Sequence, residues 1–397
     1  MCTDMVEPNR YSWVVVAASF ASFLFGPSIS YAVGVFYVAL LNEFNEDITL
    51  TAWMGSLYSS MFALTGPIAS LIINLFDCRT CVVTSGALMM IGFATSSLVT
   101  DMKLLFISYA LIAGLGTGLA HTGSSVILGY YFPENAGLAT GISISGVGLG
   151  IFVHPPLVGY LVESYGFHGA FLIVGGITFH VCVAGMLMRP ATFERKRRHV
   201  AEKSKSRRTM CVDICRFYSV LSNLSFLCFI ISLLCFALAV STEYLFLPDF
   251  FIKQGSTFQE GAFVISASGI GSIVSRILIG FALSDEKIDS ATVFPALNGI
   301  MAIFTLSLPL FLTSPFLRIF YGFILGLYTG GTWILVNTLT LQILKLEDFA
   351  TGLGVGLFFC GTGFLIGPPI AGALVEASGR YDSGFIFAGM LLKNRYH

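Results

Sequence analysis

The sequence predicts an all-α integral membrane protein made of two six-helix bundles related by a pseudo-two-fold axis. Three observations predict it. Of the 397 residues, 55% are hydrophobic and only 11% are charged, apolar runs follow one another along the chain, and one motif occurs twice. Soluble domains average about 25% charged residues. The composition therefore excludes a soluble globule, a disordered chain and a nucleic-acid-binding protein.

Eleven apolar runs reach the length of about 20 residues that a spanning helix needs. A twelfth run, 383–392, covers only about 15 Å of the roughly 30 Å hydrocarbon core, so we expect a truncated twelfth helix. The chain then divides into a terminus at 1–11, a first bundle at 12–188, a polar loop at 189–222 and a second bundle at 223–397. The full runs are 12–40, 51–76, 80–99, 104–129, 137–162, 168–188, 223–248, 260–283, 291–313, 316–343 and 350–376.

The basic residues predict the orientation in the membrane. The polar loop 189–222 carries ten of the 21 lysines and arginines. With this loop in the cytoplasm, sixteen basic residues lie on that side and four on the other. Cytoplasmic loops of membrane proteins show such an excess, so we expect both termini in the cytoplasm. The loop is interpreted as a topology anchor, with binding of membrane lipid or a partner as the alternative.

The two halves carry an internal repeat. The motif 155–163, Pro-Pro-Leu-Val-Gly-Tyr-Leu-Val-Glu, returns at 368–376 as Pro-Pro-Ile-Ala-Gly-Ala-Leu-Val-Glu. The offset is 213 residues, and Gly141, Gly148 and Gly150, earlier in the same span, map across the same distance onto Gly354, Gly361 and Gly363. The fifth span therefore repeats as the eleventh. Two parallel six-helix halves are the layout of transporters whose halves rock about a site at the membrane midplane.

Short motifs occur at fixed places in these spans. The segment 131–146 opens with Tyr-Phe and runs through Leu-Ala-x-Gly, 166–171 reads Gly-Phe-His-Gly-Ala-Phe, and 187–190 reads Leu-Met-Arg-Pro. Together they resemble the monocarboxylate transporter family of the major facilitator superfamily. The resemblance implies a major facilitator-type fold and solute transport. It also implies a single-span immunoglobulin-like partner, which many members need to reach the plasma membrane.

Two departures from the family pattern bear on coupling. Many proton-coupled members carry a lysine in span 1, where this sequence has Tyr31. They also carry an Asp-x-x-x-Arg pair in span 8, where this sequence has Ser272 and Arg276. The arginine is kept and the aspartate is lost. The sequence therefore favours facilitated diffusion, or coupling to something other than protons, over proton symport.

Arg276 is the sharpest candidate for a functional residue. It is the only lysine or arginine deep in a predicted span, about 24 Å along a helix that begins near Glu260. A buried guanidinium is costly unless it is paired or hydrated, so we expect it to face a central cavity. Its planar fork binds a carboxylate through two parallel hydrogen bonds. We interpret it as an anchor for a substrate carboxylate, with a structural pair to Asp285 or to a carbonyl as the alternative.

The resemblance implies that four further residues shape the pocket: Tyr31 in span 1, and Tyr328, Thr332 and Asn337 in span 10. Tyr328 and Thr332 are four residues apart and share a helix face, whereas Thr332 and Asn337 need not. The alternative role for such polar side chains is hydrogen bonding between helices.

Glu243 and His154 are the candidates for proton transfer or gating. Glu243 stands about five residues from the predicted outer end of span 7. We interpret it as an outer gate or a proton acceptor, with an interfacial glutamate in contact with water as the alternative. His154 precedes the break at Pro155, where a neutral hydrogen-bonding histidine is the alternative to a proton relay. The nine cysteines predict no disulfide framework. No motif indicates a cofactor, and a metal site is only a remote alternative.

These features predict a plasma-membrane secondary transporter, not an enzyme, that moves a small monocarboxylate or related organic anion by alternating access. The competing hypothesis, favoured by the short twelfth helix, is a non-transporting or truncated membrane subunit or sensor that associates with a full-length carrier. The expected partners are the organic anion, membrane lipid and the immunoglobulin-like ancillary protein. No nucleic acid, metal or cofactor is expected.

Overall fold

The computed structural model describes residues 10–44, 47–132, 136–191, 194, 220–283, 288–308, 314–344, 348–378 and 382–393. Most of the polar loop 189–222 lies outside the described residues, as do Asp285 and the segment 133–135. Nine described helical stretches are long and apolar enough to cross a membrane. Two shorter apolar helices, Ser290–Leu306 and Ser383–Leu392, add to them. The predicted all-α architecture is confirmed.

The first crossing is broken in the middle. It begins as α1 (Arg10–Phe25), passes through the 3₁₀ turn η1 (Pro27–Ala32) and continues as α2 (Val33–Phe44). Pro27 opens the turn, where the N–H that proline lacks is not needed. The remaining elements of the first half are α3 (Ile48–Leu64), α4 (Gly66–Leu75), α5 (Cys78–Ser96), α6 (Met102–Leu105), the π-helical stretch η2 (Phe106–Ala113), α7 (Gly114–Tyr131), α8 (Ala136–Thr178) and α9 (His180–Leu187).

The long element α8 is a hairpin of two crossings. Its direction reverses at Gly166, which has a φ of 69°. Residues other than glycine rarely adopt this left-handed conformation, because their Cβ atom clashes with the main chain. The turn at Gly166 therefore separates the fifth crossing from the sixth, which continues through α9.

The described residues of the second half form six helices, and four of these begin with a side-chain cap. Asn223, Asp289 and Ser314 each accept a hydrogen bond from the first turn, and Thr257 forms a capping box with Glu260. These caps satisfy N–H groups that a helix end leaves free. The helices are α12 (Leu224–Lys253), α13 (Phe258–Ala282), α14 (Ser290–Leu306), α15 (Pro315–Ile343), α16 (Phe349–Ser378) and α17 (Asp382–Lys393).

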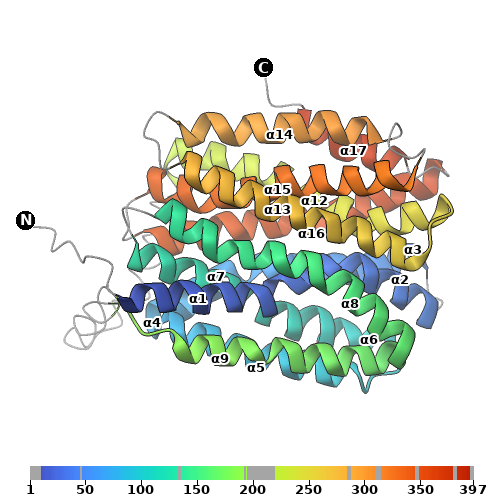
Figure 1. The fold of residues 1–397 in the computed structure, drawn as a ribbon, viewed down its shortest axis with the longest axis horizontal. Helices are drawn as coiled ribbons and strands as arrows, with labels where there is room; N and C mark the ends of the chain where they lie inside the picture. Colours follow the sequence, from blue (N-terminus) through green and yellow to red (C-terminus); the bar gives the residue numbers. More distant parts are fainter. Residues whose placement is uncertain are drawn as a thin grey trace, which may run out of the picture.

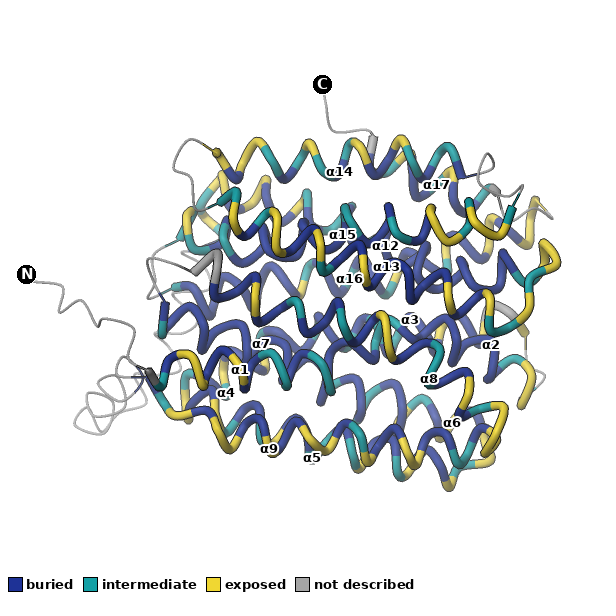
Figure 2. The backbone as a smooth tube through the Cα atoms, viewed as in Figure 1, coloured by how far each residue is buried: buried dark blue, intermediate teal, exposed yellow. Residues whose placement is uncertain are grey.

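The two halves lie side by side, with the first half coloured blue to green and the second yellow to red (Figure 1). In this view α5 and α9 lie at the edge of the first half, and α14 and α17 at the edge of the second. Figure 2 shows that the helices between these edges are mostly buried, whereas α5, α9 and α14 alternate buried and exposed residues. The core therefore lies where the two halves meet.

Large apolar side chains cover the outer surface. A soluble monomer rarely exposes apolar patches of such extent, and lipid is the solvent that accepts them. The most exposed of them include Leu98 in the turn after α5, and Leu224, Leu278, Phe281, Ile303 and Phe316 on the described helices. The protein is therefore a multi-pass membrane protein.

The halves contact each other along two seams. In the first seam, α8 packs against α13, where Ser266 Oγ donates to the main-chain oxygen of Phe152 over 2.5 Å. In the second, α4 packs against α16, where a Cβ added to Gly66 would lie 2.6 Å from the Gly354 carbonyl oxygen. Small residues of this kind let helix backbones approach closely in membranes.

The contact between α13 and α15 is tightest at Gly326, where an added Cβ would overlap the main chain of Ser268. We expect Gly326→Ala to lower the midpoint of thermal unfolding in detergent, because overpacking costs about 1–3 kcal/mol. Gly176→Ala in α8 is the matched control, since nothing lies within 4 Å of its added Cβ. An equal response of the two variants would contradict this account of the packing.

Candidate functional site

Arg276 is almost completely buried, with 1% of its surface exposed, at the contact between the two halves. Its Nη1 atom donates to the main-chain oxygen of Ile144 in α8 over 2.6 Å, and its Nε atom donates to Gly330 in α15 over 3.4 Å. Because α8 belongs to the first half and α15 to the second, the guanidinium bridges them. Neither partner is charged.

Close helix packing brings these carbonyls to the guanidinium. A Cβ added to Gly141 of α8 would lie 3.3 Å from the carbonyl oxygen of Arg276, and one added to Gly330 would lie 2.6 Å from Ser272 Oγ. A larger residue at either glycine would hold its helix away from α13. The sequence therefore places glycines where the two neighbouring backbones must come near the arginine.

The positive charge of Arg276 has no carboxylate partner among the described residues. A guanidinium carries five N–H donors, and the two bonds to carbonyls use two of them. Asp285, which the sequence suggested as a structural partner, lies outside the described residues. The site can therefore offer further donors and an uncompensated charge to an anion.

Two tyrosines flank the guanidinium. Tyr31 comes from η1 and Tyr244 from α12, their rings meet edge to face with centroids 5.0 Å apart, and both interact electrostatically with Arg276. The Tyr244 hydroxyl lies 3.2 Å from Ser268 Oγ and 3.2 Å from Thr329 Oγ1. Tyr31 thus lies beside Arg276, and its role as a substrate-binding residue stays a prediction. Tyr244 was not among the sequence candidates.

A cluster of rings surrounds Trp333 of α15, and we call it the central aromatic cluster. It joins helices of both halves, with ring centroids 5.8 to 6.4 Å from that of Trp333. Such apolar walls lower the local dielectric and strengthen the field of a nearby charge. The other members are Phe62 of α3, His121 of α7, Phe236 of α12 and Phe364 of α16.

A small cavity of about 30 Å³ lies between the halves. This is room for about one water molecule. An organic anion therefore needs the halves to separate before it can enter. The lining comes from both halves: Ser30, Tyr31, Val33, Ser59 and Phe62 from the first, and Val240, Ser241, Tyr244 and Phe364 from the second.

Several polar atoms near the centre lack a hydrogen-bond partner among the described residues. Among them are His121 Nδ1 and Asn337 Oδ1, and both residues are buried. Asn337 follows Trp333 by four residues and therefore shares its face of α15. Buried polar atoms are normally paired, so these two are candidates for contact with a ligand or water. The role of Asn337 in binding stays a prediction.

Tyr328 and Thr332 do share a face of α15, but that face packs against α14. The Tyr328 ring stacks on Phe304 with centroids 6.0 Å apart, and Thr332 Oγ1 lies 3.5 Å from Asn298 Oδ1. The structure therefore does not bring these two residues to Arg276. Their spacing predicted the common face correctly, and their contact with substrate stays a prediction that the geometry does not support.

Glu243 lies deeper in the protein than the sequence suggested. We expected it about five residues from the end of its span, but α12 continues to Lys253, ten residues beyond it. Pro248 lies inside this helix, as proline can in a membrane helix where neighbouring groups satisfy the freed backbone carbonyl. Glu243 is 0% exposed, and Thr305 of α14 donates to its Oε1 atom over 2.5 Å. The interpretation as an interfacial glutamate in contact with water is therefore wrong.

His154 connects two elements of the first half. Its Nδ1 atom lies 3.0 Å from Ser28 Oγ in η1, and the Ser28 hydroxyl donates to the main-chain oxygen of Leu24 over 2.6 Å. Because the serine has a single proton to give, Nδ1 is the donor in the contact with it. This is the geometry of a hydrogen-bonding structural residue, and the role of His154 in proton transfer stays a prediction.

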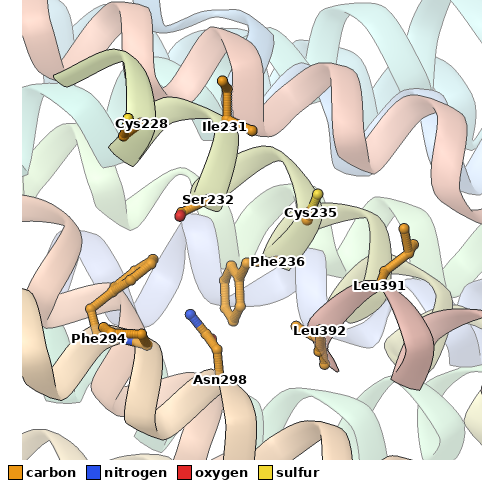
Figure 3. Close-up of a pocket in the computed structure, with 10 residues that line it drawn as sticks. Cys228, Ile231, Ser232, Cys235, Phe236, Phe294, Asn298, Leu391 and Leu392 are labelled. Carbon is orange, nitrogen blue, oxygen red and sulfur yellow. The ribbon is translucent and has the colours of Figure 1, made fainter. Parts of the chain in front are cut away.

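A larger cavity, of about 290 Å³, lies at the edge of the second half between α12, α14 and α17. Figure 3 shows the Asn298 amide and the Phe236 ring pointing into it. None of its lining residues is charged. It therefore offers no counter-charge to an anion, and the Arg276 site is the better candidate.

Comparison with known proteins decides the family. Residues 16–287, more than half of the chain, match the family described as Major Facilitator Superfamily. The chain belongs to this superfamily. Members of it are transporters, so the buried site lies in a membrane transporter and not in an enzyme.

Named relatives in the superfamily are monocarboxylate transporters. Monocarboxylate transporter 12 of Mus musculus is 28% identical over 96% of this chain and 83% of its own length. Monocarboxylate transporter 6 of Mus musculus is 28% identical over 97% and 86%, and monocarboxylate transporter 9 of Pongo abelii is 26% identical over 96% and 90%. The family recognised from the sequence motifs is confirmed.

Solved structures show the same major facilitator fold. A transporter of the POT family, crystallised with 5-aminolevulinic acid, has a TM-score of 0.73 at 17% identity, covering 98% of this chain and 95% of its own. The Escherichia coli fucose:proton symporter has a TM-score of 0.69 at 12% identity, covering 96% and 97%. The fold class predicted from the sequence is therefore confirmed.

The sequence reasoning missed the residues that enclose the Arg276 site. Trp333 is one of only three tryptophans in the chain and lies one turn before Asn337, a spacing that indicated its position on the same face. Tyr244 directly follows Glu243 in an apolar span. Neither the spacing of Trp333 from Asn337 nor the position of Tyr244 after Glu243 shows which residues of the other half these two side chains contact.

We expect His154→Ala to destabilise the transporter by about 1–3 kcal/mol, because it removes a buried ring and leaves the Ser28 hydroxyl without its donor. His180→Ala is the matched control, since His180 is exposed on α9. Thermal unfolding of both purified variants in detergent measures the difference. A midpoint for the His154 variant equal to that of the wild type would refute the structural role.

Proposed function

We propose that this transporter carries a small monocarboxylate, or a related organic anion, across the plasma membrane by alternating access. The observation that carries the proposal is the Arg276 guanidinium, which is buried between the halves without a carboxylate partner among the described residues. The names of the relatives, monocarboxylate transporters 12, 6 and 9, support the substrate class.

The energetics of the guanidinium favour an anionic substrate. A charge at this depth costs several kcal/mol unless it is paired or hydrated, and the two neutral carbonyls offset only part of that cost. A substrate carboxylate supplies the missing counter-charge and accepts two parallel hydrogen bonds from the fork. The Tyr31 and Tyr244 rings exclude water around the pair and so strengthen it.

The bond between Arg276 and Ile144 connects substrate binding with movement of the halves. A carboxylate that takes the Nη1 donor removes it from the Ile144 oxygen, and this breaks a hydrogen bond across the seam between α8 and α13. The arginine then moves with the second half, and the first half is released. Rocking of two rigid bundles about a midplane site is how such folds expose a substrate to either side.

The remaining candidates have separate roles in this proposal. Tyr31 and Asn337 contact the substrate, and His121 adds a further polar atom from the first half. Tyr328 and Thr332 hold α15 on α14. We also propose that both termini are cytoplasmic, as the basic loop predicts, and that an immunoglobulin-like single-span protein accompanies the transporter to the plasma membrane.

Uptake of radiolabelled lactate, pyruvate and a panel of other organic anions into oocytes tests the proposal. We expect Arg276→Lys to lower uptake by about tenfold or more, which corresponds to about 1.4 kcal/mol, because an ammonium group cannot reproduce the bidentate fork. Arg79→Lys, an exposed position at the start of α5, is the matched control and should transport like the wild type.

Surface delivery must be equal in every arm, measured by surface biotinylation with and without the ancillary protein. Unchanged uptake by the Arg276→Lys variant would contradict the proposal that Arg276 binds the substrate. Failure of the wild type to take up any anion of the panel, with normal surface delivery, would favour the alternative of a non-transporting subunit or sensor.

A further inference from the structure

A cavity of about 290 Å³ at the edge of the second half takes no part in the proposed anion site. Its walls come from α12, α14 and the last turn of α17 (Figure 3). Two of the lining residues, Cys228 and Ile231 of α12, are also exposed on the outer surface, where large apolar side chains indicate contact with lipid. A molecule dissolved in the bilayer can therefore reach this cavity directly.

Two side chains on different walls offer polar groups to the cavity. Asn298 of α14 is only 9% exposed, and its amide points into the cavity (Figure 3). Its single hydrogen bond among the described residues joins Oδ1 to Thr332 Oγ1 over 3.5 Å, so its amide nitrogen has no partner there. The Ser232 hydroxyl of α12 also lines the cavity and has no hydrogen-bond partner among the described residues. Buried polar groups are normally paired, so these two point to a ligand.

Both polar groups lie at the depth of the lipid tails. Ser232 and Asn298 each stand eight residues beyond the first residue of their helix, which is about 12 Å along it. This depth lies within a hydrocarbon core about 30 Å thick, where bulk water does not satisfy polar groups. A lipid tail cannot satisfy them either, because it has no hydrogen-bonding atom. The ligand must therefore bring its own polar group into the bilayer.

The lining restricts the chemistry of this ligand. None of the lining residues is charged, so an ion would leave its charge unpaired. The volume lies at the lower end of the range for small-molecule sites, roughly 300–1,000 Å³. An amide and a hydroxyl each donate and accept hydrogen bonds, and an alcohol group does both in return. Phe236, Phe294 and Leu392 supply apolar walls for the rest of the molecule.

Phe236 connects this cavity to the central aromatic cluster. Its ring lines the cavity, and its centroid lies 6.0 Å from that of Trp333. Thr332, which contacts Asn298, directly precedes Trp333 in α15. A ligand in the cavity therefore contacts two side chains that hold α15 in the closed conformation, in which the central cavity is small.

We infer that the cavity between α12, α14 and α17 is a binding site for a small, uncharged, lipid-soluble alcohol, separate from the Arg276 site. The hydroxyl of the ligand bonds to Asn298 and Ser232, and its apolar part packs against Phe236 and Phe294. Because the ligand binds the closed conformation, it favours that conformation and slows transport. The effect on transport rests on the proposed function, whereas the binding does not.

Protection of a thiol in the purified full-length protein tests the binding. Cys235 lines the cavity, and its alkylation by monobromobimane can be followed by peptide mass spectrometry. The probe is 4-phenyl-1-butanol, and its matched control is n-butylbenzene, which has the same carbon skeleton without the hydroxyl. At four times its dissociation constant the alcohol occupies about four-fifths of the sites, so we expect alkylation to slow about fivefold.

The polar contacts are tested by variants and by the hydrocarbon. We expect Asn298→Leu, and n-butylbenzene on the wild type, to need about a tenfold higher concentration in the detergent phase for half protection, because hydrogen bonds to the ligand are lost. Ser232→Ala gives a second test that leaves α14 unchanged. Asn74→Leu, on α4 of the first half, is the matched control and should be protected like the wild type.

Equal protection of the Asn298 and Asn74 variants, or equal protection by the alcohol and the hydrocarbon, would overturn the recognition of a hydroxyl. Unchanged alkylation of Cys235 with either compound at saturation would overturn the site itself. These results do not depend on transport, so they stand even if the oocyte assay fails for every anion.

Uptake into oocytes tests the effect on transport. With labelled lactate, or the anion of the panel that the wild type transports best, we expect 4-phenyl-1-butanol to lower the maximal rate, and excess anion should not restore it. Asn298→Leu should resist the inhibition, while Asn74→Leu responds like the wild type. Inhibition that excess anion relieves would place the alcohol at the Arg276 site and overturn the inference of a separate site. Full uptake while Cys235 is protected would overturn the effect on transport.

Discussion

The structure depends on holding one positive charge, without a carboxylate partner in the described part of the chain, between two apolar bundles. The guanidinium of Arg276 is tolerated at this depth because a main-chain carbonyl from each half reaches it, and these carbonyls reach it because glycines let α8 and α15 approach α13. The aromatic cluster around Trp333 then keeps the surroundings dry. The close packing of the helices, the hydrogen bonds of Arg276 and the proposed site therefore depend on the same contacts between helices.

In the proposed function, neutral partners suit a charge that must exchange ligands. An ion pair inside the protein would satisfy Arg276 permanently and would cost several kcal/mol to break. Carbonyl oxygens hold the fork more weakly, so a carboxylate can displace them.

Much of the fold was predictable, and part of the site was. The apolar runs and the repeat at 155–163 indicated two six-helix halves, and the isolated charge of Arg276 pointed to the site. The depth of Glu243 was wrong, because the predicted span ended at residue 248, whereas α12 continues past Pro248 to Lys253. Trp333 was missed, because nothing in the sequence of its span marks which residue meets the other half.

The sequence by itself determined that the chain crosses the membrane many times, that it repeats, and that one arginine is buried. Only the tertiary structure decided which face of each helix looks inward, and therefore that Tyr31 meets Arg276 while Tyr328 meets α14. The physical reason is that lipid and protein interior are equally apolar. In water, hydrophobic periodicity orients a helix because its buried face is apolar and its exposed face is polar. In a bilayer both faces are apolar, so close packing and polar contacts orient the helix instead.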